Sequence, residues 1–125
     1  MGSEETVFLQ RPAERHDFIA WAELLKVLAH PSRLMLIEAL SGGEQCVRDL
    51  TEVVGHDIST VSKHLNLLRE NGIVADDKRG KQVYYRLRIP NVLHVFYLLE
   101  AIRGADRLQS GPSIPPARPG ERDGG

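Results

Sequence analysis

The chain has 125 residues, of which 42% are hydrophobic and 26% are charged, and its formal net charge is −1 at pH 7. This balance is ordinary for a globular protein, and the length allows one domain but hardly a second. The longest apolar runs are far shorter than the roughly 20 residues that a membrane-spanning helix needs, so we expect a cytoplasmic protein with no membrane partner.

The two ends of the chain have little to bury. The last sixteen residues, SGPSIPPARPGERDGG, contain four prolines and four glycines. Such a composition cannot offset the entropy cost of ordering the backbone. We therefore expect a flexible N-terminus over residues 1–12, one folded domain over residues 13–108 and a disordered tail over residues 109–125.

Three helices are predicted before residue 56, because apolar residues recur there at intervals of three and four. The first follows Pro12, the second begins near Pro31 and ends at Gly42, and the third ends at Gly55. Their apolar stripes consist, in chain order, of Phe18, Trp21, Ala22, Leu25 and Leu28, then of Leu34, Ile37 and Leu40, and then of Val47, Leu50, Val53 and Val54.

A fourth helix is predicted from about Ile58 to Asn71, where Gly72 ends it. Asp57 is placed to cap its N-terminus, since a carboxylate there accepts from the free amides of the first turn. We expect Ile58 to join the core. The other side of this helix is polar, so the third and fourth helices have the pattern of a helix-turn-helix. Its apolar stripe consists of Ile58, Val61, Leu65 and Leu68.

A β-hairpin is predicted next, because the segments IVADD and KQVYYRLR follow strand spacing and flank the residues KRG. Gly80 can take the positive φ that a tight hairpin turn requires. Tyr84 and Tyr85 alternate across the second strand, so at least one of them should be buried. A hairpin directly after a helix-turn-helix is interpreted as a wing.

Positive charge is concentrated in this part of the chain. Residues 55–88 hold seven basic and four acidic residues, a surplus of three positive charges in a chain whose net charge is −1. A basic helix followed by a basic hairpin favours a nucleic-acid surface. The alternative for the hairpin tip is an ordinary charged turn that keeps the protein soluble.

A fifth helix is predicted near the end of the folded domain. Its apolar face is wider than one small core would use, so this face should need a partner. The residues of this face are Val92, Val95, Phe96, Leu99 and Ile102, together with Leu93 and Leu98.

Four blocks, LAHPSRLMLIEAL, CVRDL, STVSKHLNLLRENGIV and GKQVYYRL, occur in this order over roughly residues 20–103. With them the chain resembles the arsenic-repressor (ArsR/SmtB) family of bacterial winged-helix regulators. The resemblance implies an α+β, mostly helical winged helix-turn-helix fold with about five helices and a two-stranded hairpin wing. It also implies a homodimer that represses transcription on an inverted-repeat, double-stranded DNA operator and releases it when an inducer, often a metal ion, arrives.

The family's DNA-reading positions match residues at the start of the fourth helix. Short hydroxyls can approach phosphates and base edges closely, and a lysine adds a positive charge. His64 could instead pack against another helix, and Arg33 is expected to pair with a carboxylate such as Glu38 or Asp49. The candidate DNA-binding residues are Ser59, Thr60, Ser62, Lys63, His64 and Asn66 on the helix, and Lys78, Arg79 and Lys81 on the wing.

The family resemblance places the dimer interface on the first and last helices. Their wide apolar faces agree with this role, because one small core could not cover them. The candidate interface residues are Phe18, Trp21, Leu25, Val95, Phe96 and Leu99.

Cys46 is the one cysteine of the chain, and it bears on the inducer. Many family members carry two cysteines one residue apart at the start of the third helix, but Arg48 stands where the second thiol would be. We therefore expect no thiolate-rich arsenic or cadmium site, and the last helix lacks the second histidine that a zinc site would need. The sequence thus predicts no cofactor and no metal ion.

Three alternatives for Cys46 stay open. It could join a mixed metal site with His16 or Asp17 of the other subunit. It could act as a redox sensor, since it lies near a helix N-terminus and near Arg48. It could also be an inert, small apolar residue. If it is inert, the signal would be a small organic effector or would be lacking.

Two other classes of function fit the sequence less well. No phosphate loop, Cys-His pair or pair of catalytic carboxylates marks an enzyme, so we expect none. A winged helix that mainly binds protein would be expected to carry acidic residues on its wing, whereas the tip here reads KRGK.

Overall fold

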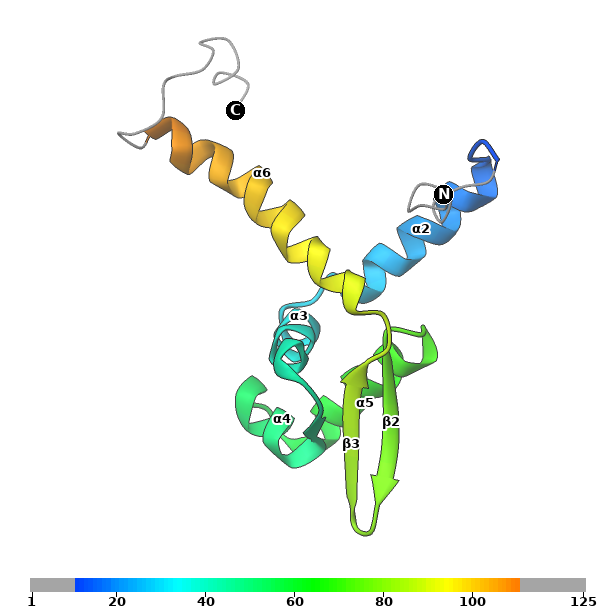
Figure 1. Cartoon of the computed structure of the whole chain (residues 1–125), viewed down its shortest axis with the longest axis vertical. Coiled ribbons are helices and arrows are strands. Elements are labelled where there is room, and N and C mark those ends of the chain that lie inside the picture. Colours follow the sequence, from blue (N-terminus) through cyan, green and yellow to red (C-terminus); the bar gives the residue numbers. More distant parts are fainter. Residues whose placement is uncertain (1–10, 111–125) are drawn as a thin grey trace. The chain divides into compact units, whose positions relative to one another are not determined.

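The computed structural model describes residues 11–110, with the side chains of residues 11–104. The chain divides into two compact units, Met1–Ile89 and Pro90–Gly125 (Figure 1). The first unit contains α2 (Arg15–Leu28), α3 (Pro31–Ala39), the 3-10 turn η1 (Leu40–Gly42), β1 (Gln45–Cys46), α4 (Val47–Val54), α5 (Ile58–Glu70), β2 (Val74–Arg79) and β3 (Gln82–Leu87). The second contains the 3-10 turn η2 (Pro90–Leu93) and α6 (His94–Ser110).

The five predicted α-helices and the predicted hairpin are therefore confirmed in the described part of the chain. The last helix begins later than expected, because Pro90–Leu93 forms a 3-10 turn and places Val92 outside α6. Such turns are common at helix N-termini. No helix among residues 11–110 is long and apolar enough to cross a membrane. The single domain expected over residues 13–108 stays a prediction.

The expected terminal segments fall mostly outside the described residues, which exclude 1–10 and 111–125. Within the expected flexible N-terminus, Arg11 is held by a two-pronged ion pair with Asp17, at 2.6 and 2.9 Å. Asp17 also accepts from the amide of Glu14 and so closes a capping box at the start of α2. Chain order thus extends at least to residue 11.

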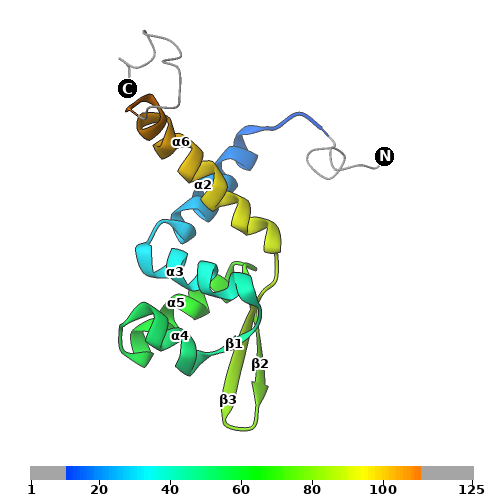
Figure 2. The same ribbon diagram turned by 60° about the vertical axis from the view of Figure 1, so that its left-hand side comes forward.

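The β-sheet has three antiparallel strands in the order β1-β3-β2. Gly80, with φ of 63°, supplies the predicted turn between β2 and β3, and we call this hairpin the wing. β1 was not predicted, because a strand of two residues is too short to show an alternating pattern. Cys46 of β1 pairs with Tyr84 of β3, and Figure 2 shows β1 beside the wing.

Two further helix starts are fixed by side-chain caps. Asp57 accepts from the amide of Thr60 at 3.0 Å, which confirms the predicted cap of α5. At α3 the cap is His30, whose Nδ1 accepts from the amide of Ser32 at 3.0 Å, while Pro31 occupies the first helical position. Sequence reasoning found Pro31 but not the histidine cap.

The core of the first unit lies between α3, α4, α5 and the sheet. α5 buries Val61, Leu65 and Leu68 completely, and Tyr85 is the tyrosine that faces inward, as alternation along β3 predicted. The other large side chains that are fully buried are Leu36, Ile37, Leu50 and Val74.

Two expected core residues are exposed instead. Ile58 is 54% exposed, because it lies at the edge of the α5 stripe in the first turn, where no preceding turn covers it. Val53 is 45% exposed, since the short α4 fully buries only Leu50. The expectation that Ile58 joins the core was therefore wrong.

Leu65→Ala should lower the free energy of unfolding by about 2–5 kcal/mol, because it leaves a cavity in a fully buried position. Ile58→Ala should change it by less than about 0.5 kcal/mol, because the isoleucine is already exposed. Urea denaturation followed by circular dichroism measures both. Equal losses in the two variants would contradict the exposed position of Ile58.

Candidate nucleic-acid interface

α4 and α5 form the helix-turn-helix, with Gly55 at φ of 82° ending the first helix. The turn needs this glycine because an L side chain is strained at that φ. With its apolar face buried, α5 turns its polar side outward. Among the predicted reading residues, Ser59, Lys63 and Asn66 are exposed, and Thr60, Ser62 and His64 are half-buried. Their contacts with DNA stay predictions.

Asp57 and Thr60 interact at the start of α5. The Thr60 hydroxyl and amide hold the pKa of the Asp57 carboxyl below its ordinary value, and the Ser59 hydroxyl, 3.4 Å away, adds to this. Asp57 is therefore ionised at neutral pH and caps the helix. Because Thr60 is already engaged by this cap, it is less available to DNA than the exposed Lys63.

His64 lies at the edge of the buried face, turned toward α3. Its Nδ1 is 3.1 Å from Arg33 Nη1, and its ring is 4.5 Å from the ring of His30. Burial, followed by the nearby charges of His30, Arg33 and His56, lowers the pKa of His64. The sequence left open whether His64 contacts DNA or packs against another helix. The structure provides partners for the packing role, namely Arg33 and His30.

The expected carboxylate partner of Arg33 was wrong. Arg33 donates instead to the Val27 carbonyl and to His64. Glu38 lies five residues along the same helix, roughly 140° around its axis from Arg33. Asp49 is exposed in the first turn of α4. Helical spacing did not reveal the two partners that Arg33 has, because Val27 belongs to the preceding helix and His64 is 31 residues away in the sequence.

The three basic side chains predicted on the wing differ in their ion pairs. Lys78 and Lys81 are exposed, and no ion pair is recorded for either within residues 11–104. Arg79 instead pairs with Glu44 at 2.5 Å and Asp77 at 2.9 Å, which together raise its pKa. Its guanidinium also lies 4.5 Å over the ring of Tyr84. Arg79 thus ties the wing to the segment before β1.

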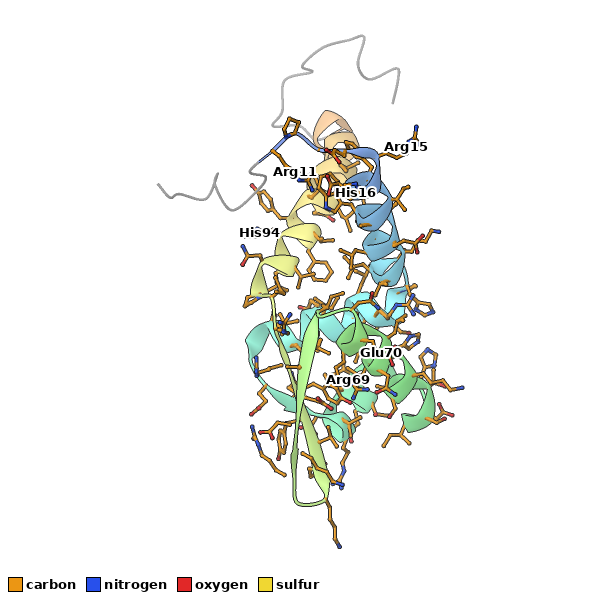
Figure 3. All side chains as sticks on the ribbon, turned by 90° about the vertical axis from the view of Figure 1, so that its right-hand side faces the viewer. Arg11, Arg15, His16, Arg69, Glu70 and His94 are labelled. Carbon is orange, nitrogen blue, oxygen red and sulfur yellow. The ribbon has the colours of Figure 1, made fainter. Side chains whose placement is uncertain are left out.

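A second arginine joins the wing to α5. Arg69 pairs with Asp76 of β2 at 3.0 Å, and Figure 3 shows it at the end of α5 beside the hairpin. Arg69 thus joins the wing to the helix-turn-helix, while Arg79 joins it to the segment before β1. Sequence reasoning did not predict Glu44, Asp76 or Asp77 as partners of these arginines.

Comparison with known proteins decides the family. A profile described as "Bacterial regulatory protein, arsR family" matches residues 30–76, which include the helix-turn-helix and the start of the wing. The regulator NmtR of Mycobacterium tuberculosis is 39% identical over 106 residues, which cover 82% of this chain and 87% of NmtR. The chain belongs to the ArsR family of bacterial regulatory proteins. The family was predicted correctly from the four sequence blocks.

Two further relatives of this ArsR-family chain agree in sequence and in structure. The biofilm growth-associated repressor of Xylella fastidiosa is 47% identical over 66 residues, but the match spans only 53% of this chain and 58% of that repressor. The homodimeric winged helix-turn-helix DNA-binding domain of a possible ArsR-family regulator from Mycobacterium bovis superposes with a TM-score of 0.64 at 25% identity. That likeness covers 82% of this chain and 96% of the domain.

The helices α2 and α6 each expose a broad apolar face. Of α2, only Leu28 is buried, whereas Phe18 is 56% and Leu25 60% exposed. On α6, Leu99 is exposed, and Val95 and Phe96 are half-buried. Other large apolar side chains exposed on these helices are Ile19, Trp21, Leu24, Tyr97, Leu98 and Ile102.

Cys46 lies in β1 and is half-buried at the start of α4. Among the described residues, no three histidine, cysteine, aspartate or glutamate side chains are grouped to hold a metal ion. His16 lies near Arg11 at the start of α2 (Figure 3). Its Nε2 is 3.6 Å from Asp17, whose pKa Arg11 holds far below its usual range. A metal would have to displace that arginine from Asp17.

Removal of the Arg79 contacts should loosen the wing. Arg79→Ala should speed amide hydrogen exchange of β2 and β3 by a few-fold, because it deletes both ion pairs and the ring contact. Glu44→Gln should have a smaller effect in the same direction. Lys81→Ala is the control and should exchange like the wild type. Unchanged exchange in Arg79→Ala, measured by mass spectrometry, would show that Arg79 does not restrain the wing.

Proposed function

We propose that this chain is a transcriptional repressor that binds double-stranded operator DNA as a homodimer in the cytoplasm. The observation that carries this proposal is the exposed polar face of α5, with Ser59, Lys63 and Asn66. Beside it, the two lysines of the wing are exposed and form no ion pair within residues 11–104. Family membership and the names of the relatives, several of which are called repressors, support it.

In this proposal α5 enters the major groove. Lys63 and Asn66 are one helical turn apart on its outer face and can reach phosphates or base edges. The exposed Ile58 at the first position can meet a thymine methyl group. Lys78 and Lys81 at the wing tip suit phosphates or the minor groove.

The salt dependence of binding tests this proposal. If Lys63, Lys78 and Lys81 of both subunits neutralise about six phosphates, the logarithm of affinity should fall with the logarithm of salt concentration at a slope of about −5. Each of Lys63→Ala, Lys78→Ala and Lys81→Ala should make the slope less steep by about two. The probe is a duplex selected by the protein from random sequences, and fluorescence anisotropy measures the affinity.

Two controls sharpen this measurement. Arg79→Ala should leave the slope nearly unchanged, because Glu44 and Asp77 already neutralise that guanidinium. Lys26→Ala, on α2, should also leave it unchanged. Binding that ignores salt, or a slope that changes as much in Lys26→Ala as in Lys63→Ala, would refute the assignment of this surface.

The dimer would cover the apolar faces of α2 and α6. A side-by-side pair of α5 helices would then reach successive major grooves, so the operator should be an inverted repeat with half-sites about one helical turn apart. Exposed leucine, phenylalanine and tryptophan side chains on α2 support this assembly, since monomers rarely leave so large an apolar patch in water.

Leu25→Glu should convert the dimer to a monomer at micromolar concentration, because it places a charge in the centre of the α2 apolar face. Val53→Glu is the matched control, since Val53 is exposed on α4, outside the proposed interface. Light scattering coupled to size exclusion measures the mass. A wild-type monomer, or a dimer that survives Leu25→Glu, would contradict this interface.

The inducer is proposed to be neither arsenite nor zinc. One thiol per chain and the exposed Arg48 beside it disfavour a thiolate-rich cation site. The signal would then be a small organic ligand or oxidation of Cys46. The mixed site of Cys46 with His16 or Asp17 is less favoured, because Asp17 is already bound by Arg11.

The basic wing tip likewise disfavours a role confined to binding protein.

A further inference from the structure

Three basic side chains, His30, Arg33 and His64, form a cluster where three helices meet. His30 caps α3, Arg33 lies in the first turn of α3, and His64 belongs to α5. All three are half-buried. The cluster contributes nothing to the exposed face proposed to contact DNA, so its arrangement calls for another explanation.

Arg33 bridges two helices through its guanidinium. Its Nε donates to the Val27 carbonyl in the last turn of α2, and its Nη1 is 3.1 Å from His64 Nδ1 on α5. Carbonyls in the last turn of a helix have no partner within the helix, and a cation is favourable at that end of the helix dipole. The planar guanidinium can serve both acceptors at once, whereas an ammonium group has no such rigid fork.

These hydrogen bonds determine the protonation of both imidazoles. A guanidinium only donates, so His64 Nδ1 must be an acceptor without a proton. The amide of Ser32 likewise donates to His30 Nδ1 at 3.0 Å. A proton added to either Nδ1 would place a donor against a donor and would break that hydrogen bond.

Among the side chains of residues 11–104, no ion pair with a carboxylate offsets such a proton on His64. The groups that act on His64 electrostatically are His30 and Arg33 of α3 and His56 of the turn before α5, and all of them are bases. In the part of the chain that the structure describes, no ion pair joins His64 to a carboxylate of α2, α4 or β2. The pKa of His64 is accordingly lowered, with burial as the largest cause.

We infer that Arg33 is a positioning residue that holds α5 in its DNA-reading orientation by fixing His64 to the end of α2, and that it does so only while His64 is neutral. This inference rests on the proposed DNA-binding function. It differs from the sequence-based role of His64 as a DNA contact, because here His64 acts through Arg33. It also links the helix proposed for dimerisation to the helix proposed for reading.

The affinity of variants for the selected duplex tests the bridge at about pH 8. Arg33→Ala should weaken binding by about tenfold or more, because it deletes charged hydrogen bonds to both helices. Arg33→Lys should not restore the affinity, since its ammonium lacks the fork that holds both acceptors. A cooperative melting transition for each variant shows that it is folded. Wild-type affinity in Arg33→Ala would overturn the inference.

The pH profile separates positioning from direct contact. As the pH is lowered from about 8 into the acid range, wild-type affinity should fall, because neutral His64 is required and its lowered pKa places its protonation on the acid side of the ordinary histidine range. His64→Gln should show a nearly flat profile, since an amide oxygen accepts from Arg33 without titrating. His16→Gln, at the far end of α2, should keep the wild-type profile. Affinity that rises in acid would overturn the inference, because a protonated His64 touching phosphate would strengthen binding.

A titration of His64 by NMR needs no DNA. Arg33→Ala should raise the pH at which His64 titrates, because it removes a positive neighbour. An unchanged titration would show that Arg33 does not contact His64 and would overturn the inference. If no duplex is bound by any variant, the proposed function fails, and this titration alone decides whether the bridge exists.

Discussion

Burial of one face of α5 is the constraint on which the rest of the structure depends. Val61, Leu65 and Leu68 are fully buried, and they pack in a core that also fully buries Leu36 of α3 and Leu50 of α4. Because a helix is a rigid cylinder, fixing one side toward the core directs the other side outward. The polar residues of α5 are therefore presented to solvent by packing, with no need for contacts of their own.

Six basic residues of α3, α5 and the wing divide into two groups by chemistry. The arginines Arg33, Arg69 and Arg79 all have internal partners, and each joins two different segments of the fold. The lysines Lys63, Lys78 and Lys81 are exposed, and no ion pair is recorded for them within residues 11–104. This division fits the planar fork of arginine, which holds several acceptors, and the flexible point charge of lysine.

α2 has two different roles along its length. Its exposed apolar residues, such as Phe18 and Leu25, are suited to cover a second subunit, while its last turn receives Arg33. A change in how α2 packs in a dimer would thus reach His64 through a single side chain. This gives a short physical route between the proposed interface and the proposed reading helix, because the Arg33 guanidinium contacts both α2 and α5.

The sequence by itself determined the local features of this protein. Helical spacing, the Asp57 cap, the Gly80 turn and the inward position of one tyrosine depend on residues a few positions apart, so they were correctly predicted. Four ordered blocks likewise sufficed to identify the family. Such features follow from backbone geometry and short-range hydrogen bonds, which the chain carries wherever it folds.

Only the tertiary structure decided which distant side chains meet. Arg33 and His64 are 31 residues apart, Glu44 and Arg79 are 35 apart, and β1 forms solely because it lies beside β3. The exposure of Ile58 was decided in the same way, since spacing places it at the edge of the stripe but cannot say whether a neighbouring element covers it. Partner choice depends on how the elements pack, and periodicity within one element does not encode that packing.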